Sequence, residues 1–228
     1  MQQKLKIQVD PYYQKLGIKH IVYAELHGIN NQIKDTRAVD LLVEKAQQKA
    51  LLTDELSLET NAILEGYRQI TIALGRSLKK FPPSAQALIN TVQRTQTFPR
   101  INPFVDIYNA AVVDSMLSIG AHDLNKIHGN IYFRLSPGEE PFIAIGGNEK
   151  PTSKNDIVYA DERNILAWLN TRDSELAKVT PETTDVILII QGNSKTTVEY
   201  RQQVLEKLCG QITQICGGQY EIHDVCVP

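Results

Sequence analysis

The chain has 228 residues, of which 42% are hydrophobic and 22% are charged, a composition typical of a globular protein and not of a disordered one. Its 24 lysine and arginine residues against 26 aspartate and glutamate residues give a formal net charge of −2, so no overall positive field attracts phosphate groups. No apolar run approaches the roughly 18 residues that a membrane helix needs, and Met1 does not lead into a signal-peptide core. We therefore expect a cytoplasmic protein with no membrane partner.

The first 100 residues predict two strands and three helices. Residues 5–9 alternate between apolar and polar side chains, and residues 18–26 form a second strand candidate. Apolar side chains then recur at helical spacing in three segments, which begin near Thr36, Ser57 and Ser84. No internal repeat or low-complexity linker follows. We expect residues 1–100 to be a mainly helical amino-terminal part of the same globule as residues 101–228.

The second half of the chain opens with a helix signal. Asn102 can cap a helix start, Pro103 fits its first position, and apolar positions continue as far as Ile119, so Gly120 is expected to end the helix. Strands follow at residues 131–135, 142–145, 157–160, 165–169 and 186–190, and the last is apolar throughout, which predicts a central strand covered on both faces. A helix from Thr196 or Thr197 to Gly217 and a strand at 220–225 complete an α+β order.

The cysteines indicate buried thiols. There are three, with no Cys-x-x-Cys pair, and Cys209 and Cys216 are seven residues apart on the apolar face of the last predicted helix. This spacing favours free, buried cysteines and neither a disulfide framework nor a zinc site. We expect no metal ion and no cofactor.

Three polar segments stand out against this apolar background. They read NPFVDIYN at residues 102–109, GAHDL at residues 120–124 and RDS at residues 172–174. The predicted elements place them at a helix start, a helix exit and a connecting loop, which are positions where a rigid scaffold presents chemistry. We expect them to converge on one pocket.

The pattern Asn-x-x-Val-Asp-x-x-Asn, followed by a glycine, a histidine and Asp-Leu, resembles the tRNA-editing domain in the β chain of bacterial phenylalanyl-tRNA synthetase. The chain is most similar to free-standing, single-domain relatives of that module, and the resemblance covers about residues 99–192. It implies an editing-domain-like fold with a mixed β-sheet core packed with helices. It also implies that the partner is aminoacylated tRNA and not DNA, and that a mischarged ester is hydrolysed in trans without any ligase activity.

The resemblance also implies a site. His122 and Asn109 would be catalytic, and the substrate-binding residues would be Asn102, Asp106, Gly146, Arg172, Asp173, Ser174, Thr180 and Gln191. In the synthetase domain, the strand equivalent to residues 186–191 carries a glutamate that recognises the hydroxyl of a mischarged tyrosine. Here this strand ends at Gln191 and has no carboxylate, which favours a different or less polar side chain.

The most specific prediction concerns the role of His122. We place His122 partly exposed after a helix exit, so His122→Ala should lower deacylation roughly 100-fold with little loss of stability.

Each of these residues also has a structural explanation. Asn102 can be only a helix cap, Asp106 can complement the helix dipole, and Arg172, Asp173 and Ser174 can form a self-satisfied turn. Asn109 and His122 can serve structural hydrogen bonds. Two rival functions therefore stay open. One is a non-catalytic module that binds tRNA or an amino acid. The other is an unrelated small-molecule hydrolase, although the sequence shows no nucleophilic side chain with a general base beside it. The oligomeric state is left open.

Overall fold

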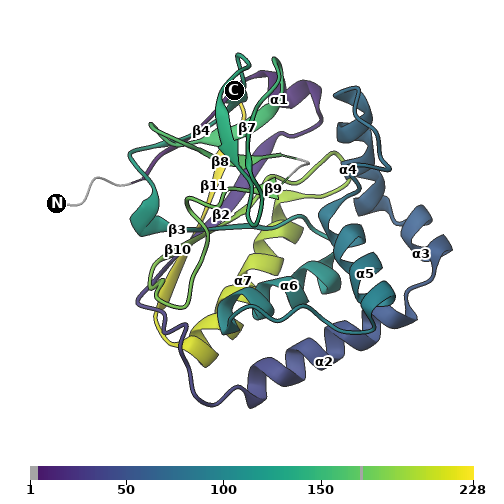
Figure 1. Cartoon of the computed structure of the whole chain (residues 1–228), viewed down its shortest axis with the longest axis vertical. Coiled ribbons are helices and arrows are strands. Elements are labelled where there is room, and N and C mark those ends of the chain that lie inside the picture. Colours follow the sequence, from purple (N-terminus) through teal and green to yellow (C-terminus); the bar gives the residue numbers. More distant parts are fainter. Residues whose placement is uncertain (1–4, 170–171) are drawn as a thin grey trace.

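The structure is a computed structural model that describes residues 5–169 and 172–228. It has three layers: helices, a four-stranded sheet and a five-stranded sheet (Figure 1). One hydrophobic cluster lies between the helices and the four-stranded sheet, and a second lies between the two sheets. The predicted α+β class is confirmed. Within the described ranges, no helix is long and apolar enough to cross a membrane.

The four-stranded sheet forms the middle layer. Its order is β11 (Gln219–Cys226), β2 (His20–His27), β10 (Val186–Ile190) and β3 (Gly120–Asp123), with every pair antiparallel. Along β10, alternate side chains belong to the two clusters, so Leu188 packs toward the helices and Ile187 and Ile189 pack toward the other sheet. The prediction of a central strand covered on both faces is confirmed.

The five-stranded sheet forms the outer layer. Its order is β1 (Ile7–Val9), β4 (Ile131–Leu135), β7 (Ile157–Ala160), β8 (Ile165–Trp168) and β9 (Arg172–Asp173). The pair β1–β4 is parallel, and the other pairs are antiparallel. A separate two-stranded ribbon consists of β5 (Pro141–Ile143) and β6 (Glu149–Pro151). Residues before 100 thus contribute β1 to one sheet and β2 to the other.

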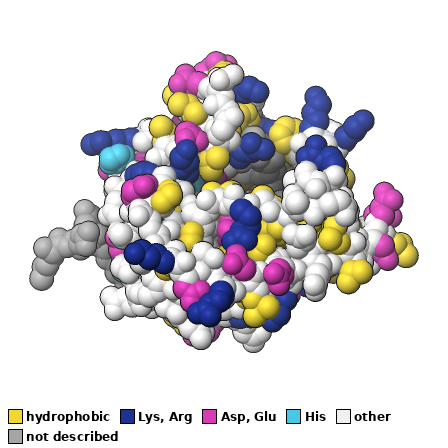
Figure 2. Space-filling view, turned by 60° about the horizontal axis from the view of Figure 1, so that its bottom comes forward, with side chains coloured by type: hydrophobic (Ala, Val, Ile, Leu, Met, Phe, Trp, Pro, Cys, Tyr) yellow, Lys and Arg dark blue, Asp and Glu magenta, His cyan; other side chains and the backbone are white. Residues whose placement is uncertain are grey.

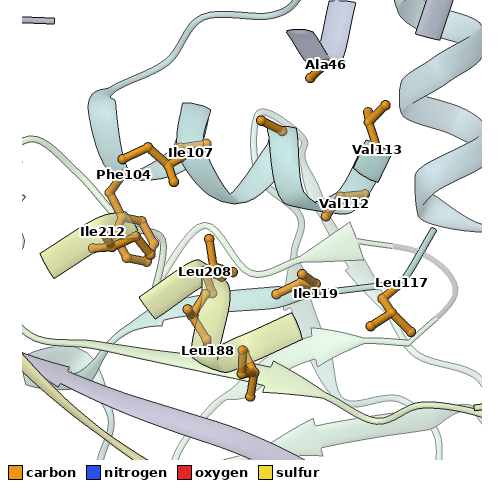
Figure 3. Close-up of a cluster of buried hydrophobic side chains, with 14 of the residues drawn as sticks. Ala46, Phe104, Ile107, Val112, Val113, Leu117, Ile119, Leu188, Leu208 and Ile212 are labelled. Carbon is orange, nitrogen blue, oxygen red and sulfur yellow. The ribbon is translucent and has the colours of Figure 1, made fainter. Parts of the chain in front are cut away.

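Most of the helices gather on the outer face of the middle sheet (Figure 1). They are α2 (Arg37–Leu52), α3 (Glu55–Thr60), α4 (Ala62–Ala73), α5 (Ser84–Thr95), α6 (Pro103–Ser115) and α7 (Val198–Cys216). The short helix α1 (Tyr12–Lys15) packs instead against the cluster between the two sheets, and a 3-10 turn, η1 (Leu124–Lys126), follows β3. Figure 3 shows the core beneath α6, where Phe104 lies near Ile212 of α7 and Leu208 of α7 lies above Leu188 of β10. This packing holds α6 rigidly beside the sheets.

Several predicted helix ends are confirmed. The Asn102 side chain accepts a hydrogen bond from the Val105 N–H at 3.0 Å, and Thr197 caps α7 through the Tyr200 N–H at 3.1 Å. Gly217 follows the last residue of α7. These caps satisfy N–H groups that have no partner inside a helix.

The predicted end of α6 is wrong. The helix stops at Ser115, and Met116 adopts the left-handed conformation with φ 60°. Gly120–Asp123, predicted as a helix exit, is strand β3, which pairs with β10. The short helices α1 and α3 were also not predicted.

The cysteine prediction is confirmed. Cys209 and Cys216 are buried and free, and Cys226 is free and exposed. Burial raises the pKa of Cys209 to about 12 and that of Cys216 to about 11, so both thiols stay protonated and unreactive at neutral pH.

Candidate functional site

A pocket of about 600 Å³ lies where α5 and α6 meet the ends of the strands of both sheets. This volume falls within the range of small-molecule sites in proteins. Its walls combine apolar and aromatic side chains with a few polar ones. The lining residues include Lys79, Lys80, Tyr108, Asn109, Gly120, Tyr159, Trp168, Leu169, Arg172, Asp173, Ile189 and Gln191.

The pocket brings together four of the predicted site residues: Asn109, Arg172, Asp173 and Gln191. Among the described residues, none forms a hydrogen bond with the side chain of Asn109, although it lies in the middle of α6. Gln191 is 6% exposed, and its Oε1 is buried without a hydrogen-bond partner in the described structure. Buried polar atoms are normally paired, so the Gln191 oxygen is well suited to bind a ligand, and the half-buried Asn109 side chain is available to the same ligand.

His122 lies directly behind the pocket wall. It is fully buried on β3, and its Nε2 lies 2.5 Å from the hydroxyl of Tyr159, which lines the pocket from β7. The two rings meet edge to face at 5.3 Å. The expectation of a partly exposed histidine is therefore wrong, because the residue sits on a strand between two sheets and not after a helix.

Burial decides the protonation of this histidine. It lowers the pKa of His122 from 6.5 to about 3, so the imidazole is neutral at pH 7. Its Nδ1 is buried without a partner among the described residues. A buried N–H left unpaired costs more than an unpaired acceptor. The favoured tautomer therefore carries its proton on Nε2 and donates to the Tyr159 oxygen, which leaves the tyrosine O–H free to donate into the pocket.

Gly120 provides the space for this hydroxyl. A Cβ at residue 120 would lie 2.5 Å from the Tyr159 Oη, closer than real Cβ atoms come to other atoms. The same position lies 3.8 Å from Oδ1 of Asp173. Tyr159 and Asp173 thus both lie close to the position that a side chain of residue 120 would occupy.

Asp173 has an unusual electrostatic environment. It is partly buried on β9, and burial raises its pKa from 3.8 to about 7, opposed only by a hydrogen bond from the Ala121 N–H. The negative charge of Asp173 in turn helps to raise the pKa of Tyr108 and Tyr159. Within the described structure, no cation forms an ion pair with this carboxyl. A raised pKa in a cleft is a common property of functional sites.

The remaining predicted residues lie outside this pocket. Asn102 caps α6, and Asp106 accepts hydrogen bonds from Arg100 Nε at 2.7 Å and the Ile101 N–H at 2.8 Å. The Thr180 carbonyl accepts from Asn31 Nδ2 at 2.8 Å. Asn31 in turn accepts from the Phe104 N–H, so these residues fasten the start of α6 to a loop.

Ser174 and Gly146 belong to neighbouring segments, which are joined by a bridge between Ala144 and Ser174. Ser174 is fully buried, and its N–H donates to the Leu166 carbonyl at 2.8 Å. Gly146 has φ +67°, and its N–H donates to Glu175 Oε2 at 3.2 Å. The described contacts of both residues are structural.

Sequence reasoning missed Tyr108 and Tyr159 as pocket residues. Tyr159 is the third residue of a strand whose every side chain is buried, so no pattern separates it from a core tyrosine. Tyr108 lies on the apolar face of α6, and helical periodicity does not reveal that this face also borders the pocket. The one available signal was Asn109, a residue unfavourable inside a helix.

Comparisons with known proteins agree with the earlier resemblance. A family model described as the B3/4 domain matches residues 66–208, from within α4 to within α7. The chain is 28% identical over 149 residues to the phenylalanine–tRNA ligase β subunit of Haemophilus ducreyi, covering 55% of this chain and 18% of that protein. It is 30% identical over 142 residues to the same subunit of Vibrio vulnificus strain YJ016, covering 52% and 18%.

A longer match reaches the β subunit of Vibrio cholerae, with 26% identity over 194 residues, 74% of this chain and 24% of that protein. The chain thus spans about a fifth of the length of these relatives. Among solved structures, an N-terminal fragment of the phenylalanyl-tRNA synthetase β subunit from Pyrococcus horikoshii matches with a TM-score of 0.49 and 17% identity, covering 96% of this chain and 50% of that chain.

Proposed function

Because the chain belongs to the B3/4 domain family, we propose that it binds aminoacylated tRNA and hydrolyses a mischarged ester in trans. The observation that carries this proposal is the pocket itself. It gathers Asn109, Arg172, Asp173 and Gln191 from separate elements within the residues that the family model matches. A cavity of about 600 Å³ can receive an aminoacyl group together with part of the terminal nucleoside.

The chemistry requires a positioned water and donors for the oxygen that becomes negative in the transition state. We assign the donor role to the Tyr159 hydroxyl, which the His122 imidazole orients at 2.5 Å. His122 is then a positioning residue, since it does not line the pocket. The unpaired amide of Asn109 can hold the attacking water or share the oxyanion. An aminoacyl ester is already activated, so no strong nucleophile is needed.

The mouth of the pocket suits the phosphates of the tRNA end. Lys79 and Lys80, between α4 and α5, and Arg172 on β9 are all exposed and line it. In the part of the chain that the structure describes, no hydrogen bond or ion pair occupies either lysine side chain. On the end of the molecule that lies at the bottom of Figure 1, basic and acidic side chains are mixed, as Figure 2 shows. The positive charge is therefore local, in keeping with the net charge of −2.

The double variant Lys79→Gln/Lys80→Gln should weaken the binding of aminoacylated tRNA about 10-fold at low salt. The slope of log affinity against log salt should fall by about 1.4, since each lost contact with a single strand removes about 0.7. The matched control is Lys45→Gln/Lys207→Gln, which removes two lysines from a separate groove between α2, α6 and α7. Equal losses in both double variants, measured by fluorescence titration, would contradict this placement of the phosphates.

Gln191 is the residue that we expect to contact the amino-acid side chain of the ester and to determine the preference for it. It directly follows β10, and the apolar side chains of Trp168, Leu169 and Ile189 line the same pocket. Gln191→Glu should move the preference for deacylation toward tyrosyl esters by about 10-fold, because a carboxylate is a stronger acceptor for a phenol O–H than an amide is. The measurement compares kcat/KM for tyrosyl and phenylalanyl esters on the same tRNA. An unchanged ratio would show that Gln191 does not face the side chain.

The function itself is tested by deacylation of a panel of correctly and incorrectly charged tRNAs by the purified protein. We expect one or a few mischarged tRNAs to lose their amino acid well above the spontaneous rate, and Tyr159→Phe to serve as the inactive control. The rival is a binding module without turnover. The absence of any carboxylate on β10 and the position of His122 behind the wall favour that rival, and binding without deacylation of any tRNA would establish it.

A further inference from the structure

The charged residues of the pocket are arranged by depth, with the cations outside and the carboxyl inside. The three cations, Lys79, Lys80 and Arg172, are exposed, whereas Asp173 is partly buried. Among the described residues that line the pocket, Asp173 is the only acidic one. A ligand that complements this order carries negative charge at its outer end and a positive charge at its inner end. An aminoacylated tRNA end has that order, with phosphates on the nucleotide and an ammonium on the amino acid.

We propose that Asp173 binds the α-ammonium of the aminoacyl group and thereby selects esters whose amine is free. This inference rests on the proposed function and deepens it. Among the described groups, the Ala121 N–H is the one that favours the charged form of this carboxyl, and Gly120 places no side chain beside Oδ1, which lies 3.8 Å from where a Cβ at residue 120 would stand. A carboxylate can accept about four hydrogen bonds, so it has capacity left for a three-donor ammonium.

The groups that face Asp173 support this role. Tyr108 on α6 and Tyr159 on β7 are close enough to feel its charge, and both are neutral phenols. His122 on β3, behind Tyr159, is also neutral at pH 7. No described cation balances the carboxylate, so burial raises the pKa of Asp173 to about 7 and leaves it about half protonated at pH 7 while the pocket is empty. An incoming ammonium supplies the missing counter-charge and converts an unfavourable buried charge into a hydrogen-bonded ion pair.

An N-blocked or deaminated substrate would lose this contact. It would place a neutral group against Asp173 and leave the carboxyl without a partner, which disfavours binding. The pocket should therefore discriminate between a free aminoacyl ester and one whose amine is acylated. That discrimination separates an aminoacyl-tRNA binder from a protein that acts on peptidyl or formylated esters.

The test compares two non-hydrolysable ligands by isothermal titration calorimetry at pH 7.5. One is 3′-(L-phenylalanylamino)-3′-deoxyadenosine, and the other is 3′-(3-phenylpropanoylamino)-3′-deoxyadenosine, which differs only in lacking the amine. The wild type should bind the first about 10- to 100-fold more tightly, the usual scale of a charge-assisted hydrogen bond. Asp173→Asn should bind both with similar affinity. Glu44→Gln, which removes an exposed acidic charge on α2 outside the pocket, should keep the wild-type discrimination.

Each outcome has a distinct meaning. Equal binding of the two ligands by the wild type, or discrimination that survives in Asp173→Asn, overturns the role of Asp173, and so does failure to bind either ligand. Free phenylalanine binding as tightly as its adenosine conjugate would overturn the assignment to an aminoacylated end. Discrimination without deacylation of any tRNA would support the ammonium site and reject hydrolysis. Equal deacylation of free and N-acetylated aminoacyl-tRNA would support hydrolysis and reject the ammonium site.

Discussion

Asp173→Asn should stabilise the folded protein at pH 8 by about 2 to 4 kcal/mol, since three pKa units correspond to about 4 kcal/mol. Burial raises the pKa of Asp173 from 3.8 to about 7, so the fold prefers the neutral carboxyl. The stability contributed by the neutral form is fully present below pH 3.8 and is lost as the pH rises through 7. Asparagine is neutral at every pH and can still accept the Ala121 N–H.

The measurement is urea unfolding of wild type and variant at pH 4 and at pH 8. The two proteins should be equally stable at pH 4 and differ at pH 8. A variant that is less stable than the wild type at pH 8 would mean that the carboxylate has a partner in the folded state that the structure does not show. A gain in stability together with a loss of ligand discrimination is the behaviour expected of a residue kept for function.

His122→Ala should lower the free energy of unfolding by about 2 to 4 kcal/mol, because it empties a fully buried site and leaves the Tyr159 hydroxyl without its partner. This replaces the expectation of unchanged stability that followed from a partly exposed histidine. Deacylation should fall roughly 100-fold, the scale of one oxyanion donor, as Tyr159 loses its orientation. Rates must be compared at a temperature at which circular dichroism shows the variant to be folded.

Tyr159→Phe is the matched variant for this prediction. It removes only the hydroxyl and should cause a similar loss of rate. If His122 acts through Tyr159, the double variant should be no slower than either single variant, because the two residues act as one unit. Full activity in folded His122→Ala would show that the histidine is structural, and fully multiplicative losses would show that the two side chains act separately.

The sequence predicted the elements whose signals are local. Asn102 and Pro103 mark the start of α6, and the apolar run of β10 indicates its burial on both faces. The end of α6 had no such signal. Met116 takes a left-handed conformation that usually belongs to glycine, while the glycine that follows, Gly120, is needed for contact with Tyr159 and not for ending a helix.

The site was predictable only in part, because some of its residues have a local signal in the sequence and others do not. Asn109, Arg172, Asp173 and Gln191 are polar residues in or beside apolar elements, which makes them visible in a sequence. The strand Gly120–Asp123 is four residues long and has no β-branched side chain, so nothing predicted that His122 would be buried. Its contact with Tyr159 joins residues 37 positions apart, and only the packing of one sheet against the other brings them together.

The position of β2 has a consequence for how the chain acquires its structure. This strand, at residues 20–27, lies between β10 and β11, whose residues begin at 186 and 219. At a synthesis rate of about 5 to 20 residues per second, β2 waits roughly 10 to 30 s on the ribosome for its first partner. During that time a strand whose Ile21, Val22, Tyr23, Ala24 and Leu26 are all buried in the folded protein presents both of its hydrogen-bonding edges. Nascent chains released before residue 186 should therefore aggregate or recruit chaperones, whereas chains that extend past β10 should become resistant to proteases.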